Sequence, residues 1–298
     1  PAGWLVWTDR AGESELKKYC LATRICQHLD GIPLAIELAT ARLRLLSPDQ
    51  IAARLGERFN LLTGGSRSAL PRQQTIRATI DWSYNLLAEA ERTLFNRLAV
   101  FTGSFSLEAV EAICADKIGD GTSARGIQPS HVLDLLGALV DHSLVYAQER
   151  TTEARYGLLE TVRQYALEKL VASGKLHNLQ ERHLAYYLEF TERGLPYISA
   201  GQPIWTHRFE AEYDNLRSAM EYAIANSLES AIRFEDPLVW FTEITHRDRE
   251  CYGWLMRIFE VTESWPPGKL RAIALKSAGE FTVYFGDKSQ GLAYLAAS

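Results

Sequence analysis

The sequence predicts a mostly helical chain with a winged helix in its middle. Most segments carry apolar residues at spacings of three and four, which is the period of a helix with one buried face. Strand signals are few, and the clear one is a hairpin pattern in which "SLVYAQ" and "RYGLL" flank the polar tip "ERTTEA". Several helices followed by one hairpin is the order of a winged helix. We therefore expect a helical segment, a winged helix and a helical tail, in that order.

Residues 1–66 are expected to form a small helical subdomain. Residues 13–29 place apolar side chains on one stripe, and Asp30-Gly31 ends that helix because glycine accepts a left-handed helix end. Pro33 suits the first position of the next helix, where its missing N–H is no loss. Ser47-Pro48 repeats this arrangement of a cap followed by proline.

Residues 67–175 are expected to form the winged helix. Amphipathic helices are predicted over 70–87 and 88–101, and Ser106 caps a third. The helix "HVLDLLGALVDH" then precedes the hairpin, and a last helix ends at Gly174.

Residues 176–298 read as a helical tail with a turn at "WPPGK". Its last stretch contains Gly279 and then Gly286-Asp287 ahead of an Ala/Leu/Tyr stripe. This spacing is similar to one tetratricopeptide-type helical hairpin, a unit that needs neighbours to cover its core. An ordinary helical pair is the alternative, and Trp205, Trp240, Trp254 and Trp265 are read as core or as the lining of a groove.

Composition and motifs exclude several classes of function. The 298 residues are 47% hydrophobic and 23% charged, and no run of roughly 18 apolar residues is present to cross a membrane. The four cysteines form no CxxC pair, which favours reduced thiols and a cytoplasmic location. The patterns GxxxxGK[ST], HExxH and GxSxG are absent, and the seven histidines are dispersed. We expect no catalytic residue, no metal site and no enzyme activity in this chain.

Direct binding to nucleic acid is not expected either. The helix before the hairpin would enter a major groove, yet it carries Asp134 and Asp141 and neither lysine nor arginine. Carboxylates are repelled by phosphates and cannot donate to a guanine edge. Arg150 and Arg155 on the hairpin leave a backbone contact open, although solvated charges are the simpler interpretation.

Three stretches within residues 15–175 closely resemble one protein class. They are "CQHLDGIPLAIELATARLRLLSPDQIAARLGERFNLLTGGSRSALPRQQTIRATIDWSYNLL", "ERTLFNRLAVFTGSFSLEAVEAICA" and "RYGLLETVRQYALEKL". The class is the bacterial STAND signalling ATPases, which are related to NB-ARC proteins and include LuxR-type and predicted-ATPase regulators. The resemblance implies a nucleotide-binding domain, then an ARC-like helical subdomain opened by a GxP motif, a winged helix and tetratricopeptide-like repeats.

The resemblance also implies roles for individual residues. Gly31, Pro33 and Leu34 fall on the GxP motif, which packs against an adenine nucleotide in that class, although a helix cap and first turn explain these residues equally well. A Met-His-Asp triplet of eukaryotic relatives corresponds to Leu158-Leu159-Glu160, and leucine cannot donate a hydrogen bond to phosphate. Glu160 and Arg163 are then candidates for a domain interface, or else ordinary charges at a helix start.

The function that the resemblance implies is a regulatory fragment of a nucleotide-dependent switch in transcriptional regulation. ATP or ADP would bind in the parent protein, and this chain would hold no cofactor by itself because the P-loop is missing from it. The expected partners are the N-terminal nucleotide-binding domain and an inducer protein or small ligand at the repeats, with no membrane. The alternatives are a DNA-binding winged-helix regulator and a helical-repeat scaffold that binds other proteins.

Overall fold

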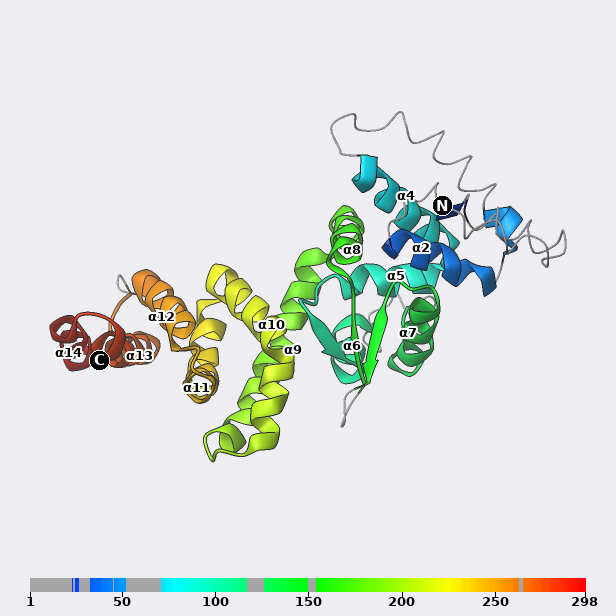
Figure 1. The fold of residues 1–298 in the computed structure, drawn as a ribbon. Coiled ribbons are helices and arrows are strands. Elements are labelled where there is room, and N and C mark those ends of the chain that lie inside the picture. Colours follow the sequence, from blue (N-terminus) through cyan, green and yellow to red (C-terminus); the bar gives the residue numbers. More distant parts are fainter. Residues whose placement is uncertain are drawn as a thin grey trace, which may run out of the picture. The chain divides into compact units, whose positions relative to one another are not determined.

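A computed structural model describes most of the chain and confirms the mostly helical class (Figure 1). The described residues are 23, 25–26, 33–44, 46–51, 71–116, 126–149, 154–262 and 265–298. Two compact units are present, one of residues 1–99 with 115–172 and one of residues 100–114 with 173–298. The domain boundaries expected at residues 66 and 175 stay predictions.

The first unit contains the helix that follows the GxP turn and most of the winged helix. Its elements are α2 (Pro33–Thr40), η1 (Ala41–Arg44), α4 (Pro71–Leu86), α5 (Glu89–Leu98), η2 (Pro129–His131), α7 (Val132–Asp141), β2 (Tyr146–Glu149), β3 (Ala154–Gly157) and α8 (Glu160–Ala172). Helix α2 begins at Pro33 as predicted, and it packs on α4 around Ala39, Ile51 and Trp82. Helix α5 packs against both α7 and α8.

Local chemistry explains where these elements start and pair. The Ser47 hydroxyl accepts a hydrogen bond from the Gln50 N–H at 3.3 Å, and the Gln50 side chain accepts from the Ser47 N–H at 2.9 Å, which is a complete capping box. Strands β2 and β3 pair antiparallel with Tyr146 opposite Gly157. A Cβ at Gly157 would lie 2.5 Å from the Tyr146 ring, so the ring requires glycine there.

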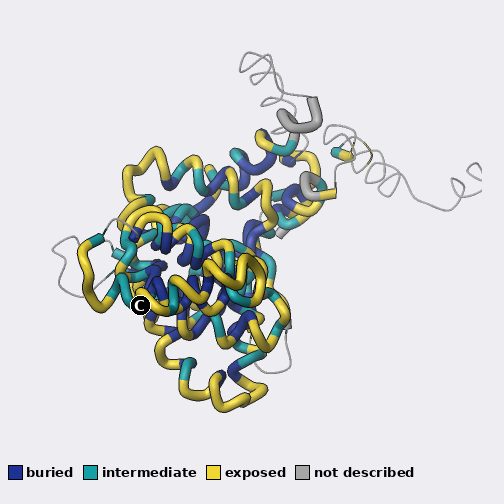
Figure 2. The backbone as a smooth tube through the Cα atoms, turned by 90° about the vertical axis from the view of Figure 1, so that its left-hand side faces the viewer, coloured by how far each residue is buried: buried dark blue, intermediate teal, exposed yellow. Residues whose placement is uncertain are grey.

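The second unit is a succession of helices preceded by one short strand. Its elements are β1 (Ser104–Ser106), α6 (Leu107–Cys114), α9 (Leu176–Ile198), α10 (Pro203–Asn226), α11 (Leu228–Thr245), α12 (Asp248–Thr262), α13 (Lys269–Phe285) and α14 (Lys288–Ala297). From α9 onward each helix packs on the next, and α11 also packs on α9 and α13. This is the packing of stacked helical repeats. Burial alternates along these helices, so each has one covered face (Figure 2).

Aromatic rings fill the core between α9, α10 and α11. Phe209 lies 5.3 Å from Phe190 and 5.6 Å from Phe241, measured between ring centroids. Gly194 allows α9 to approach this cluster, because a Cβ there would lie 2.5 Å from the Phe209 ring. Trp205 and Trp254 are buried, which supports the core interpretation for both residues.

Helices α13 and α14 approach each other through two glycines. A Cβ at Gly279 would lie 2.8 Å from Cγ of Leu295, and one at Gly291 would lie 2.7 Å from the backbone nitrogen of Val283. Asp287 caps α14 by accepting from the N–H groups of its first turn. The Gly-Asp signal in the sequence therefore marks a tight helical hairpin, as expected.

Strand β1 is held in place by a side chain from α10. The Asn215 side chain is fully buried; its Oδ1 accepts from the Thr102 N–H and its Nδ2 donates to the Ser104 carbonyl, both at 2.9 Å. Between those residues, Gly103 has a φ of +81°, and a Cβ there would lie 2.6 Å from the Asp214 carboxylate. The amide thus forms hydrogen bonds with two backbone groups of the segment that contains β1.

Candidate functional site

The residues predicted to face a nucleotide are only partly described. Pro33 is the first residue of α2 and its side chain is exposed, so its ring is accessible to a neighbouring group. Leu34 follows in the same helix turn, and Gly31 lies outside the described residues. The nucleotide-contact role of these three residues stays a prediction.

A buried arginine two turns further on joins this helix to the winged helix. Arg42 lies in η1 and has no exposed surface. Its Nη2 donates to the Ser83 carbonyl in α4 at 3.4 Å, and its Nη1 donates to Nδ1 of His142, the C-cap of α7. Because a guanidinium only donates, the His142 Nδ1 must be an unprotonated acceptor. We call Arg42, Ser83 and His142 the Arg42 junction.

The Arg42 junction is electrostatically incomplete. No carboxylate pairs with the Arg42 guanidinium among the residues that the structure describes, and neither its Nε nor the Ser83 hydroxyl has a hydrogen-bond partner. Burial lowers the pKa of Arg42 to about 10, against a smaller opposing effect of Glu91. A buried cation without a counter-ion is unfavourable, so this point of the fold responds to a change at any of its three members.

The sequence contained a signal for the Arg42 junction that our interpretation missed. Arg42 stands four residues after Leu38 and therefore falls on the apolar stripe of the helix. A charge on a buried stripe indicates a specific partner. That partner, His142, is 100 residues away and was not predictable from the pattern.

Glu160 and Arg163, the two candidates for a domain interface, contact each other at the start of α8. Arg163 Nε and Nη2 donate to the Glu160 carboxylate at 2.8 and 2.9 Å, and Nη1 reaches the carbonyl of Ala99, the C-cap of α5, at 3.4 Å. The hydrogen bond to Arg163 lowers the pKa of Glu160 and raises that of Arg163. The pair thus ties α8 to α5, and its contact with another domain stays a prediction.

In the described part of the winged helix, α7 and the hairpin present few exposed cationic side chains that could contact DNA phosphates. Helix α7 buries Val132, Leu136 and Leu139, and its exposed positions include Asp134 and Asp141. On the hairpin, Arg155 is only 4% exposed and therefore is not available to a phosphate. Arg150 lies outside the described residues.

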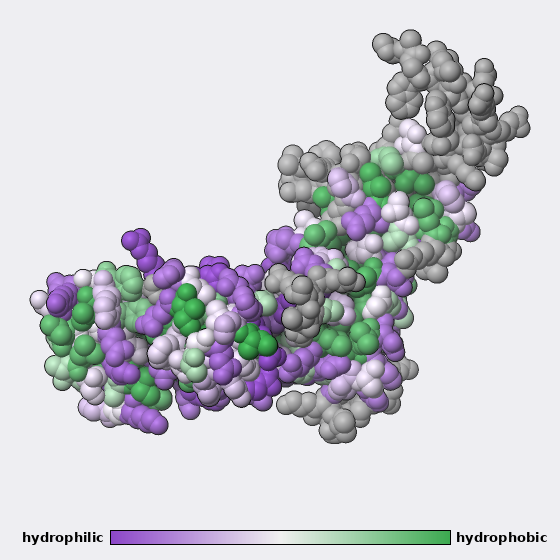
Figure 3. All heavy atoms as spheres, turned by 60° about the horizontal axis from the view of Figure 1, so that its bottom comes forward, coloured by the Kyte–Doolittle hydropathy of each residue, from purple (hydrophilic) through white to green (hydrophobic). Residues whose placement is uncertain are grey.

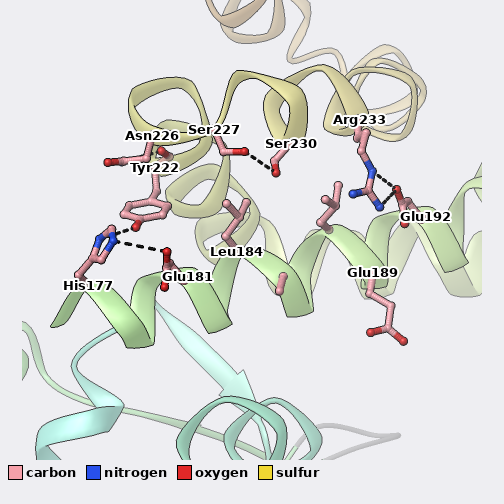
Figure 4. A pocket seen from close by; sticks show the side chains of 12 residues that line it. His177, Glu181, Leu184, Glu189, Glu192, Tyr222, Asn226, Ser227, Ser230 and Arg233 are labelled. Atoms are coloured by element: carbon pink, nitrogen blue, oxygen red, sulfur yellow. Dashed lines mark hydrogen bonds and ion pairs between the residues drawn. The ribbon is translucent and has the colours of Figure 1, made fainter. Parts of the chain in front are cut away.

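A cavity of about 650 Å³ lies between α9, the end of α10 and the start of α11 (Figure 4). At one end the Tyr222 hydroxyl bonds to Nδ1 of His177 at 2.8 Å, and Nε2 of His177 lies 3.4 Å from the Glu181 carboxylate. At the other end Arg233 Nη2 lies 2.6 Å from the Glu192 carboxylate. The sequence did not reveal this cavity, because its lining residues on α9 are at least 30 positions before those on α10 and α11 and only the packing of the three helices brings them together.

Two buried titratable groups lie elsewhere in the tail. His183 is 3% exposed, and burial lowers its pKa to about 3, against a hydrogen bond to Asn215 that favours the charged form. Glu235 in α11 is 1% exposed; one carboxylate oxygen accepts from the Ser277 hydroxyl in α13 at 2.9 Å, and the other has no partner. Burial raises the pKa of Glu235 to about 7.

Metal binding and membrane insertion are two further functions to consider for the part of the chain that the structure covers. No group of three metal-ligating side chains is found there, and no helix is long and apolar enough to span a membrane. Ile204 in α10 is an exposed apolar residue of the tail. Figure 3 shows hydrophobic and hydrophilic residues intermingled on the visible face.

Comparison with known proteins identifies the middle of the chain. A model described as "Winged helix-turn-helix domain" matches residues 87–171. These residues form a winged helix. "Putative HTH-type transcriptional regulator Rv0890c" of Mycobacterium tuberculosis strain H37Rv is 45% identical over 240 residues, which are 79% of this chain and 26% of that regulator. "Uncharacterized protein Rv0894" of the same strain is 42% identical over 159 residues, 53% of this chain and 39% of that protein.

The chain therefore spans about a quarter of the length of the transcriptional regulators that it matches. Among solved structures, it is similar to a STAND protein with a tetratricopeptide repeat sensor from Pyrococcus horikoshii, at 14% identity and a TM-score of 0.30. That match covers 89% of this chain and 53% of the other. Because the TM-score is low, it carries no argument about fold or function.

Proposed function

We propose that this chain is the regulatory part of a nucleotide-dependent transcriptional switch of the STAND type. In this proposal the helical tail senses an inducer, the winged helix transmits the change, and a nucleotide-binding domain elsewhere in the parent protein holds ATP or ADP. Any ATPase chemistry then lies outside this chain. Support comes from the STAND-like motifs of residues 15–175 and from the similarity to HTH-type transcriptional regulators.

The observation that carries the proposal is the Arg42 junction. It connects the helix that begins at Pro33 with the end of α7 through one fully buried guanidinium. A change in the position of α2 moves Arg42, and either His142 then follows or the hydrogen bond breaks. In the proposal these contacts take one arrangement in each nucleotide state, because a switch requires two arrangements with different energies.

The described residues are suited to form one wall of an adenine-nucleotide site, while the residues that bind the phosphates would lie elsewhere in the parent protein. Pro33 offers an exposed apolar ring at a helix start, and the sequence has no phosphate cradle of the GxxxxGK[ST] type. The nucleotide would supply the phosphate charge whose presence or loss sets the two states. This chain would respond to it through Pro33 and the Arg42 junction.

The proposal is tested on the product of the complete reading frame. We expect it to bind fluorescent ADP, Pro33→Ala to weaken that binding, and Arg42→Met to speed ADP release by about tenfold or more. Arg42→Met should leave the stability of the fold equal or higher, because it removes an unpaired buried charge. Arg77→Met is the matched control, since Arg77 forms an exposed ion pair with Glu168 in the same unit. A complete product without affinity for ADP or ATP would refute the proposal.

A DNA-binding winged helix is the second candidate, favoured by the winged helix-turn-helix match at residues 87–171. The carboxylates on α7 and the burial of Arg155 speak against it. Fluorescence anisotropy with labelled duplex DNA at 50 and 200 mM salt separates the two candidates. A DNA-binding protein loses affinity steeply over that range, whereas we expect no saturable binding at either salt concentration.

A further inference from the structure

We propose that the cavity between α9, α10 and α11 is a binding site for a linear aliphatic polyamine. The inference deepens the proposed function, from which it takes only the role of the tail as the sensor. Its argument is the shape of the cavity, the hydrogen-bonding atoms that remain on its walls, and their charge.

The cavity has the size and the layout of a site for a small elongated molecule. Its volume of about 650 Å³ falls within the usual range for such sites, roughly 300 to 1,000 Å³. The side chains of Leu184, Ala185 and Leu188 on α9 form an apolar floor. Polar groups lie at the two ends, with Glu181 at one and Glu192 at the other (Figure 4). These residues are eleven positions apart on α9, which is about 16 Å at 1.5 Å per residue.

The hydrogen-bond donors of the walls are largely committed to one another. Arg233 is held by Glu192, and the Tyr222 hydroxyl bonds to His177. The Asn226 amide nitrogen donates to the Tyr222 carbonyl, and the hydroxyls of Ser227 and Ser230 bond to each other.

The atoms that remain are mainly acceptors. One carboxylate oxygen of Glu181, one of Glu192 and the amide oxygen of Asn226 have no hydrogen bond recorded among the described residues. Glu181 and Glu192 provide two carboxylates on the walls against one permanent cation, the Arg233 guanidinium, which is an excess of one negative charge. In Figure 4 the Glu189 carboxylate is directed away from α10 and α11, so the argument relies on Glu181 and Glu192.

These features select one ligand chemistry. Acceptors at both ends of the groove require N–H donors at both ends of the ligand, and the excess negative charge requires that those donors be cationic. The apolar floor between them requires methylene groups. A linear polyamine has ammonium groups separated by methylene chains and meets all three conditions. Tyr222 at one end adds a ring face on which an ammonium group can rest.

Isothermal titration of the full 298-residue chain with spermine tests the proposal without any nucleotide. We expect saturable one-site binding that 1,8-octanediol, a neutral chain with hydroxyl ends, does not reproduce. Glu181→Gln should weaken spermine binding about five- to tenfold, since it replaces a charge-assisted hydrogen bond at a half-exposed site. Glu229→Gln on α11 is the matched control, because Glu229 is exposed and does not line the cavity.

A second variant fills the groove without touching a charge. Ala185 is exposed at the floor, so Ala185→Trp should abolish binding while the fold remains intact, and Ala225→Trp outside the cavity should not. Equal loss with Glu229→Gln, or no loss with Ala185→Trp, would mean that spermine binds the acidic surface in general and would overturn the proposal. Either result leaves ADP binding by the complete protein, and thus the proposed function, as a separate question.

Discussion

The buried carboxyl group of Glu235 makes the stability of the tail depend on pH in a predictable direction. Glu235→Gln keeps the shape of the side chain and the acceptor for the Ser277 hydroxyl, and it removes the ionisation. Burial, with Asp236 nearby, raises the pKa of Glu235 from 4.5 to about 7, and Ser277 and Lys276 oppose the shift. The folded state therefore holds this proton more tightly than the unfolded state.

The sign and the size follow from that difference. For an acid whose pKa is raised by folding, stability is highest below the unfolded pKa of 4.5 and falls as pH rises to about 7. A shift of 4.5 to about 7 corresponds to about 3 kcal/mol at 1.36 kcal/mol per pKa unit. Relative to the parent, Glu235→Gln should thus gain about 3 kcal/mol between pH 4.5 and pH 8.

Urea unfolding followed by circular dichroism at a series of pH values measures this effect. The quantity to compare is the difference in unfolding free energy between variant and parent at pH 8, minus the same difference at pH 4.5. This double difference cancels any constant effect of the new amide group. Glu229→Gln on the same helix is the exposed control, and for this variant the double difference in unfolding free energy should be near zero. Parallel curves for the parent and Glu235→Gln would show that Glu235 does not carry a raised pKa.

Three further predictions concern the second unit. Burial keeps His183 neutral by lowering its pKa to about 3, so the unfolding free energy should fall as pH drops below 6.5. His183→Phe should make this decrease smaller, measured by urea unfolding between pH 7 and 5. Asn215→Leu removes the two hydrogen bonds of the buried amide, to the N–H of residue 102 and the carbonyl of residue 104, and should reduce the unfolding free energy by about 3 kcal/mol, measured by urea. Gly291→Ala should lower the melting temperature because its Cβ meets the α13 backbone, whereas Gly253→Ala, with open space around it, should raise stability by up to about 1 kcal/mol.

The sequence predicted the elements well where local chemistry decides them. Pro33 starts α2, the Ser106 hydroxyl accepts from the Ala109 N–H at the start of α6, and Gly174 has a φ of +69° after α8. Each signal acts over one helix turn and depends on one residue type. The hairpin was equally clear because its two strands are neighbours in sequence.

Local rules failed where packing outweighs them. Helices α9 and α11 continue through Pro196 and Pro237, although proline removes one backbone hydrogen bond and usually ends a helix. Ile198 and Phe241, which follow these prolines, are fully buried, so core packing holds the segments in place. Strand β1 was missed because it is only three residues long, too short for an alternating pattern to show in the sequence.

The candidate sites were harder to predict than the elements. The Glu160–Arg163 ion pair is local, three residues apart on one helix; the sequence named both residues as candidates for a domain interface, and that role stays a prediction. The Arg42 junction and the cavity between α9, α10 and α11 bring together residues that are far apart in sequence. A helical pattern could therefore not predict which of these residues lie close to one another. A charge on an apolar stripe, as at Arg42, is the one local sign of such a site.

The Asn215 contact also sets an order of events when the chain is synthesised. Residues 102–104 leave the ribosome more than 100 residues before the side chain that completes their hydrogen bonds. At roughly 5 to 20 residues per second this delay is on the order of ten seconds. Until α9 has also been synthesised, the apolar face of α6, with Val110 and Ile113, has no α9 to pack against. A ribosome that stalls before α9 would therefore release a product with this apolar face exposed, and we expect that product to be prone to aggregation or to capture by chaperones.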